Sequence, residues 1–186
     1  MMITTHILLG LLLGSFVSSI LPLQGLVLFS AFGAFFPDLD MFAEHRKTFH
    51  RPFQYLSLSI FLAFGGYFSS HLLLLSLFFL SASVHCFTDI LCNGKTMRPW
   101  SSKDDRAAFN HLKQKWISPK RLFYDGSLRD LFIALILASV IIWKYSLFLE
   151  GFALLFLSAI YTLSRRRVTV VLSRYERFSE FFKDMW

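Results

Sequence analysis

Long apolar runs alternate with short polar breaks along most of the chain. The runs cover residues 4–20, 23–36, 53–67, 70–91, 129–145 and 147–163. Several are shorter than the roughly 20 residues that a helix needs to cross a ~30 Å hydrocarbon core. Turn residues stand at or near the ends of the first, third and fifth runs, namely Pro22, Gly65-Gly66 and Ser146. The pattern predicts an all-α integral membrane bundle of about six short transmembrane helices in three hairpins.

Two polar segments complete what we expect to be a single membrane-embedded domain, residues 1–186. Residues 92–128 form a polar loop module, in which Ser102 and Asp105 match a helix-capping box and predict a short helix over residues 103–116. Ser127 and Asp130 predict a cap of the same kind at the start of the fifth run. Beyond residue 164, apolar side chains recur at helical spacing among charges, which predicts an amphipathic interfacial helix over residues 164–186.

The composition supports a membrane protein. Hydrophobic residues make up 55% of the chain and charged residues 17%, against about 45–50% and about 25% in a typical soluble domain. The two cysteines, Cys86 and Cys92, have a spacing that fits neither a zinc site nor a redox pair, so we expect both to be reduced.

The basic residues are sorted along the chain. Eighteen of the 19 lie in residues 41–52, residues 92–129 or the tail after residue 163, and the remaining one is Lys144. Because basic loops stay in the cytoplasm, the sorting predicts a multi-pass protein of the cell (inner or plasma) membrane with both termini cytoplasmic. The net charge of +7 is then explained by contact with anionic membrane lipid, and no specific nucleic-acid partner is expected.

Ionisable residues within the apolar runs point to function, because burying them in a membrane is costly. His85 and Asp89 stand at positions i and i+4, so both face one side of a helix. This spacing suits two ligands of one metal, or a ligand and the group that orients it. A hydrogen bond between the two side chains within the helix explains the spacing equally well.

The six-helix topology brings further polar residues to the same membrane face. Four histidines and three aspartates emerge at the cytoplasmic side, whereas only His71 lies at the opposite face: His6, Asp38, Asp40, His45, His50, His85 and Asp89. Imidazole and carboxylate groups without a thiolate fit a divalent metal, with zinc favoured over manganese or iron. Such a metal lowers the pKa of a bound water, and the hydroxide attacks a phosphoester.

Neighbouring basic residues allow two interpretations. Arg46 could stabilise an anionic oxygen of the substrate, or it could serve only topology and headgroup contact. For Lys47 and Arg51 we prefer the second interpretation, and we expect His111 to be a solvated residue on the predicted loop helix.

Four sequence blocks carry a family resemblance. They are THILLG at residues 5–10, GAFFPDLD at 33–40, HRKTFH at 45–50 and HCFTDIL at 85–91. With these blocks the chain resembles the YdjM-like family of membrane-bound metal-dependent hydrolases, and residues 98–127 resemble its archaeal branch. The family is distantly similar to zinc-dependent phospholipases C and zinc nucleases, which share an H-x-x-x-D element.

The resemblance implies a helical zinc site that hydrolyses phosphodiesters or phosphomonoesters. Asp40 and His45 would be ligands or the general base, and five residues would be metal ligands: His6, Asp38, His50, His85 and Asp89. The chain departs from the family pattern at Lys47, Phe49 and Arg51, where many members have Gly, Thr and Ser. It also lacks the additional His and Glu that complete a trinuclear phospholipase site, which implies fewer metals.

Three functions remain open at this point. The first is a phosphoester hydrolase acting on a lipid or lipid-linked substrate at the cytoplasmic interface. The second is a metal or proton transporter, which should distribute ionisable residues to both faces. The third is a membrane anchor whose basic loop recruits an acidic partner, and it leaves the convergence of His and Asp unexplained. We prefer the hydrolase, which requires His6, His50 and His85 to meet in one pocket.

Overall fold

The helices of the structure coincide with the apolar runs of the sequence. The computed structural model describes residues 1–42, 47–93, 108–111, 113–118, 120, 122–124 and 126–164. Its helices are α1 (Ile3–Ile20), α2 (Leu26–Phe35), the 3-10 helix η1 (Phe36–Phe42), α3 (Pro52–Gly65), α4 (Ser70–Leu91), α5 (Leu128–Tyr145) and an unlabelled helix, Phe148–Ser164. The prediction of a mostly helical protein is confirmed.

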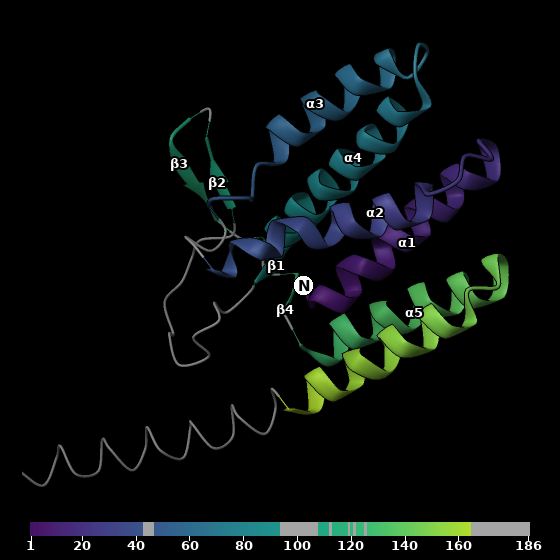
Figure 1. The fold of residues 1–186 in the computed structure, drawn as a ribbon. Coiled ribbons are helices and arrows are strands. Elements are labelled where there is room, and N and C mark those ends of the chain that lie inside the picture. The colour runs from purple at the N-terminus through teal and green to yellow at the C-terminus, as the bar shows by residue number, and fades with distance from the viewer. Residues whose placement is uncertain are drawn as a thin grey trace, which may run out of the picture.

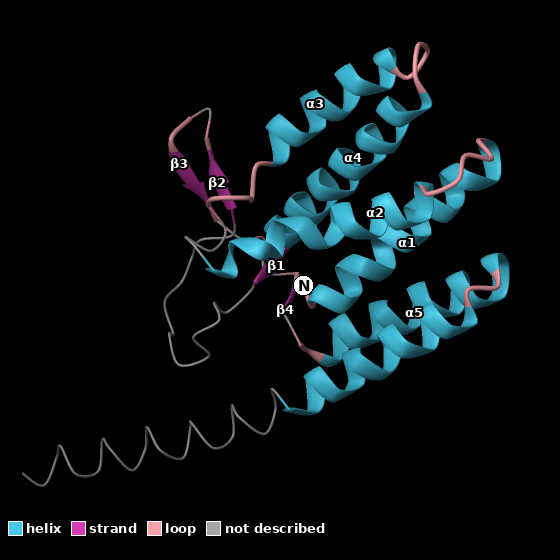
Figure 2. Cartoon of the chain, in the orientation of Figure 1, coloured by secondary structure: helices cyan, strands magenta, loops and turns pink. Residues whose placement is uncertain are grey.

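The helices pack as three hairpins side by side (Figure 1). The hairpin of α1 and α2 lies in the centre, with α2 against α4 on one side and α1 against α5 on the other. Two left-handed residues help to form the turns, Gly25 before α2 and Ser146 after α5. The hairpin tips point to one end of the molecule, and the N-terminus and the short strands lie at the other (Figures 1 and 2). We call the latter the polar end.

Small residues allow the central helices to approach closely. A Cβ at Gly10 of α1 would crowd Ser30 and Ala34 of α2, and a Cβ at Gly33 of α2 would collide with the backbone carbonyl of Phe78 on α4. Close packing of this kind holds helices together where lipid tails leave no hydrophobic driving force between them. The α1–α2 and α2–α4 contacts therefore depend on the absence of side chains at these glycines.

Serine hydroxyls add hydrogen bonds between the same helices. Ser30 donates to the carbonyl of Gly10 at 2.7 Å, and its hydroxyl lies 2.6 Å from that of Ser81 on α4. Ser59 and Ser76 join α3 to α4, each donating to the other's carbonyl, at 2.9 and 2.8 Å. These bonds satisfy hydroxyl groups that hydrocarbon could not solvate.

The outer faces of the helices are strongly apolar and exposed. Large side chains such as Phe61, Phe64 and Trp143 are 73%, 77% and 86% exposed. A soluble monomer rarely exposes extended apolar surface of this kind. By length and composition, α1 and α4 are the two described helices able to cross a membrane as single long spans.

Short strands occupy part of the polar end (Figure 2). β2 (Ala108–Asn110) pairs antiparallel with β3 (Lys115–Ile117), and β1 (Cys92–Asn93) pairs parallel with β4 (Phe123–Tyr124). The helix predicted over residues 103–116 is therefore wrong from residue 108 onward. Phe109 and Trp116 pack edge to face across the β2–β3 pair, and this cross-strand contact outweighs a helix signal that came from residues 102–105. Residues 102–105, which carry the helix signal, and the tail after residue 164 lie outside the described residues.

Asp130 joins the third hairpin to the start of α1. Its backbone N–H donates to the Ser127 hydroxyl at 3.2 Å, which confirms the predicted cap. Its buried carboxylate accepts from the backbone N–H of Met2 at 2.8 Å and the Thr5 hydroxyl at 2.9 Å. The first turn of α1, which carries His6, is thus held from α5.

We predict that Gly33→Ala destabilises the protein by about 1–3 kcal/mol, because the added methyl group forces α2 away from α4. Ala63→Leu serves as a control, since residue 63 is exposed on α3 and a larger side chain there meets no neighbouring helix. Thermal unfolding in detergent measures both. Equal stability of Gly33→Ala and the wild type would contradict the close α2–α4 contact.

Candidate metal centre

Four buried side chains from three segments meet at the polar end. Asp38 comes from η1, His50 from the loop before α3, and His85 and Asp89 from one face of α4. Each offers one ligand atom, and these atoms all lie within 4.8 Å of one another. The cluster could hold a metal ion, with two imidazole and two carboxylate ligands.

The orientation of His85 is fixed by the backbone of α2. Its Nδ1 lies 2.6 Å from the carbonyl oxygen of Ala34. A carbonyl only accepts, so Nδ1 carries the hydrogen and the neutral ring has its lone pair on Nε2. That Nε2 lies 3.5 Å from an oxygen of Asp38 and 3.5 Å from an oxygen of Asp89.

Two buried polar atoms at the centre of the cluster lack hydrogen-bond partners within the described part of the chain. His85 Nε2 and Asp38 Oδ2 are buried and have no hydrogen-bond partner among the described residues. A lone pair that faces two carboxylates is repelled by both, and leaving buried polar atoms unpaired is costly. A cation between these atoms would turn the repulsion into coordination, so the donor set fits a divalent metal.

His50 is oriented by a carboxylate behind it. Its Nδ1 lies 2.7 Å from Asp40, and its Nε2 lies 3.2 Å from Oδ2 of Asp89. Burial alone lowers the pKa of His50, but the bonds to Asp40 and Asp89 outweigh it and raise the pKa to about 9. A metal therefore competes with a proton for Nε2. Asp40 is fully buried and takes the place of the carboxylate that commonly orients a metal-binding histidine.

Asp38 completes the set from η1, which directly follows α2. Burial raises the pKa of its carboxyl group above the ordinary value. A bound cation would have the opposite effect and favour the carboxylate form.

Asp89 divides its two oxygens between two groups of residues. Oδ2 faces His50 and His85, whereas Oδ1 lies 3.0 Å from His6 Nε2 and 3.0 Å from the Met1 amine. The His6 ring stacks on the His85 ring, with the centroids 3.7 Å apart. His6 is thus brought against the cluster but stands outside the set of four ligand atoms.

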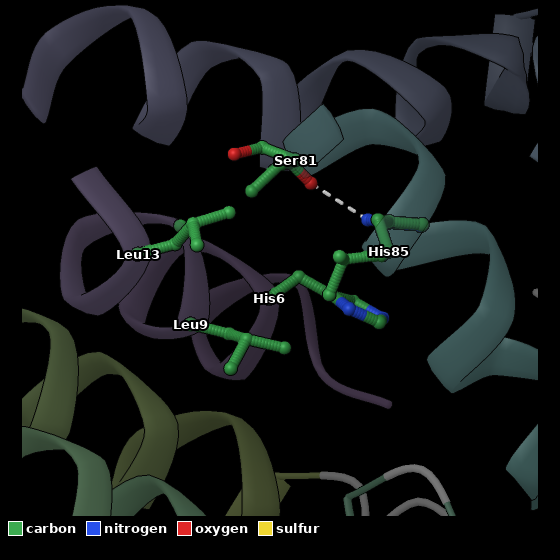
Figure 3. Close-up of a pocket in the computed structure, with 8 residues that line it drawn as sticks. His6, Leu9, Leu13, Ser81 and His85 are labelled. Atoms are coloured by element: carbon green, nitrogen blue, oxygen red, sulfur yellow. Dashed lines mark hydrogen bonds between the residues drawn. The ribbon is translucent and has the colours of Figure 1, made fainter. Parts of the chain in front are cut away.

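A small cavity adjoins the stacked rings (Figure 3). It measures about 10 Å³ and is lined by His6 and His85 together with residues of α1, α2 and α4: Leu9, Gly10, Leu13, Ala34, Ser81 and Val84. That is room for about one water molecule.

Other candidate residues have different surroundings. His45 and Arg46 lie outside the described residues. The exposed Arg51 side chain donates to the Thr48 carbonyl at 3.0 Å, and Lys47 lies 5.5 Å from the Phe109 ring. His111 is not on a helix: it is in the β2–β3 turn, and its Nε2 lies 2.7 Å from the Lys47 carbonyl. It supports the loop that carries His50.

Sequence reasoning missed two groups that shape the site. The Ala34 carbonyl is a backbone atom, which no side-chain pattern reveals. The hydroxyl of Thr88 lies 3.3 Å from His6 Nδ1 and donates to the His85 carbonyl at 2.8 Å. Thr88 lies within the HCFTDIL block, and this is the sequence signal from which its role could have been predicted.

Fold and cluster together define a helical membrane protein with a buried His/Asp site that could bind a metal. The family model described as YdjM inner membrane protein matches residues 1–168. The chain belongs to this family of membrane proteins. No curated protein and no solved structure matches the chain.

We predict that His85→Ala and His50→Ala each abolish metal binding, because each removes one of four ligands. His6→Ala should retain the metal with affinity reduced by about 10- to 100-fold, as expected for a residue that acts through a ligand. His71→Ala is the control, since His71 is exposed at the hairpin-tip end. Metal analysis of purified protein measures all four. Complete loss of metal from His6→Ala would extend the ligand set beyond the four residues.

Proposed function

We propose that this protein is a membrane-bound metal-dependent hydrolase that cleaves a phosphoester in a lipid or lipid-linked substrate at the cytoplasmic face. The observation that carries the proposal is the buried Nε2 of His85, unpaired and aimed at two carboxylates. A purely structural hydrogen-bond network would satisfy that atom. Membership of the YdjM family supports the membrane setting.

Each residue of the centre has a proposed role. Asp38, His50, His85 and Asp89 would hold a divalent cation, zinc by preference for this donor set. Bound there, the cation would supply Lewis acidity toward water and a phosphoryl oxygen.

Asp40 is better explained as a positioning residue than as the general base, because its carboxylate faces His50 Nδ1. His6 is hydrogen-bonded to Asp89 and lines the small cavity, which supports a proposed role in exchanging a proton with a water there. From the family resemblance we retain His45 as a general-base candidate and Arg46 as an anion-binding candidate.

The proposed topology has six helices crossing or entering the membrane, with both termini in the cytoplasm. Three hairpin tips at one end and the His/Asp cluster at the other support it. Four of the five described lysines, Lys47, Lys113, Lys115 and Lys120, belong to loops or strands of the polar end, and the fifth, Lys144, lies at the end of α5. Positive charge on that side favours the cytoplasm.

We predict that Tyr67→Cys, at the α3–α4 tip, reacts with a membrane-impermeant maleimide in intact cells. Tyr67 is 90% exposed. Lys113→Cys, in the β2–β3 turn, should react only after permeabilisation. Both variants are made after replacing Cys86 and Cys92 by Ser. The reverse labelling pattern would invert the topology and contradict a cytoplasmic site.

We predict that the purified protein with zinc or manganese hydrolyses a phosphoester lipid in mixed micelles, and that removing the metal abolishes turnover. The substrates are phosphatidic acid, a monoester, and phosphatidylglycerol, a diester. His85→Ala should be inactive, His71→Ala should match the wild type, and Asp40→Asn should lose about 10- to 100-fold in activity together with metal affinity.

Chromatographic detection of released phosphate, diacylglycerol and phosphatidic acid measures the turnover. Stoichiometric metal without turnover of either lipid would contradict the hydrolase and favour a non-enzymatic metal-binding protein.

A further inference from the structure

A second, larger cavity lies between α1 and α5, outside the candidate metal centre. Its volume is about 360 Å³. Four residues of α1 and three from the last turns of α5 line it: Leu9, Leu12, Leu13, Phe16, Val140, Lys144 and Tyr145. We call it the α1–α5 groove. It has the size of a ligand site.

No described residue fills the groove. All of its α1 lining is aliphatic or aromatic, so this wall offers a water molecule no hydrogen-bond partner. Leu9 to Phe16 span about 10 Å along the helix axis. The groove is open at the surface of two helices that we place in the membrane, so hydrocarbon is the available occupant.

One end of the groove carries a positive charge. Lys144 is exposed, and its ammonium group lies 5.7 Å from the centre of the Tyr145 ring. The described residues include no carboxylate within ion-pair distance of it. Trp143, next to it, is 86% exposed, as is typical of an aromatic residue at the interface. A lipid phosphate would complement Lys144 in charge and in hydrogen bonding.

We propose that the α1–α5 groove binds one anionic phospholipid from the leaflet opposite the metal centre. An acyl chain lies along α1 from Phe16 toward Leu9, and the phosphate contacts Lys144. This also accounts for the one basic residue that the sequence leaves outside the basic loops and tail.

The bound lipid is not the substrate of the proposed hydrolase. α1 and α5 run in the same direction, because the first turn of α1 contacts Asp130 while Phe16 lies beside Lys144. The phosphate therefore sits at the hairpin-tip end and the His/Asp cluster at the other. Leu9 and Leu13 line both the groove and the small cavity beside His6 and His85, so the end of the acyl chain packs on the wall of the site.

Native mass spectrometry of the detergent-solubilised protein tests the proposal with phosphatidylglycerol and phosphatidylcholine of identical acyl chains. The wild type should retain one lipid, with phosphatidylglycerol bound about fivefold more tightly, because its net negative headgroup is attracted by Lys144 whereas the choline ammonium offsets the phosphate charge of phosphatidylcholine. Lys144→Gln should bind the two lipids equally. Val140→Phe should retain neither, because the new ring occupies the groove.

Matched controls separate these effects from general changes in charge or bulk. Lys113→Gln removes an exposed lysine at the polar end and should keep the preference. Ile136→Phe adds the same ring on an exposed position of α5 and should keep the lipid. If Val140→Phe does not fold, Leu12→Phe replaces it.

An unchanged preference in Lys144→Gln, or retention of lipid in a folded groove-filling variant, would overturn the proposal. The test uses metal-free protein, in which the proposed hydrolase would not consume phosphatidylglycerol, so its result is independent of the proposed function.

Discussion

The candidate site depends on how closely α2 approaches α4. A glycine at position 33 lets the two backbones meet at Phe78. The next residue, Ala34, then places its carbonyl 2.6 Å from His85 Nδ1, and η1 follows directly with Asp38. The close helix contact that Gly33 permits thus fixes the tautomer of His85 and the position of Asp38, two of the proposed ligands. The chemistry at the polar end is a consequence of helix packing within the apolar part.

The membrane environment requires the polar groups between the helices to be satisfied within the protein. Hydrocarbon cannot satisfy a hydroxyl or a carboxylate, so each polar group inside the bundle needs a partner within the protein. Ser30, Ser59 and Ser76 find theirs across helix interfaces. Partners are missing among the described residues at Ser15 Oγ on α1 and, within one cluster, at His85 Nε2 and Asp38 Oδ2. Two unpaired atoms in the same cluster are more informative here than they would be in a soluble protein.

Hydrophobic patterning was sufficient to predict the helices, because an apolar run bounded by turn residues has few alternatives in lipid. The spacing of His85 and Asp89 was sufficient to place both on one face. The same reasoning could not assign Asp40, because the contact of its carboxylate with His50 Nδ1 depends on the tertiary structure and not on a helical repeat. It also failed for residues 108–117. Here the contact between Phe109 and Trp116 stabilises a β-hairpin, and local helix-capping signals give no information about such a contact. The separation of His6 from the four-atom set depends on how Asp89 divides its two oxygens.

Asp130 has a consequence for the order of assembly. In the proposed topology it enters the membrane with the last hairpin, long after the first helix has been synthesised, yet it accepts the backbone N–H of Met2 and the hydroxyl of Thr5. Until that hairpin inserts, the beginning of the chain lacks its buried acceptor, and the turn that carries His6 is free to fray. In that topology the centre is completed by the third hairpin, and a nascent protein truncated before residue 130 would carry every proposed ligand without the Asp130 contacts that hold the first turn of α1.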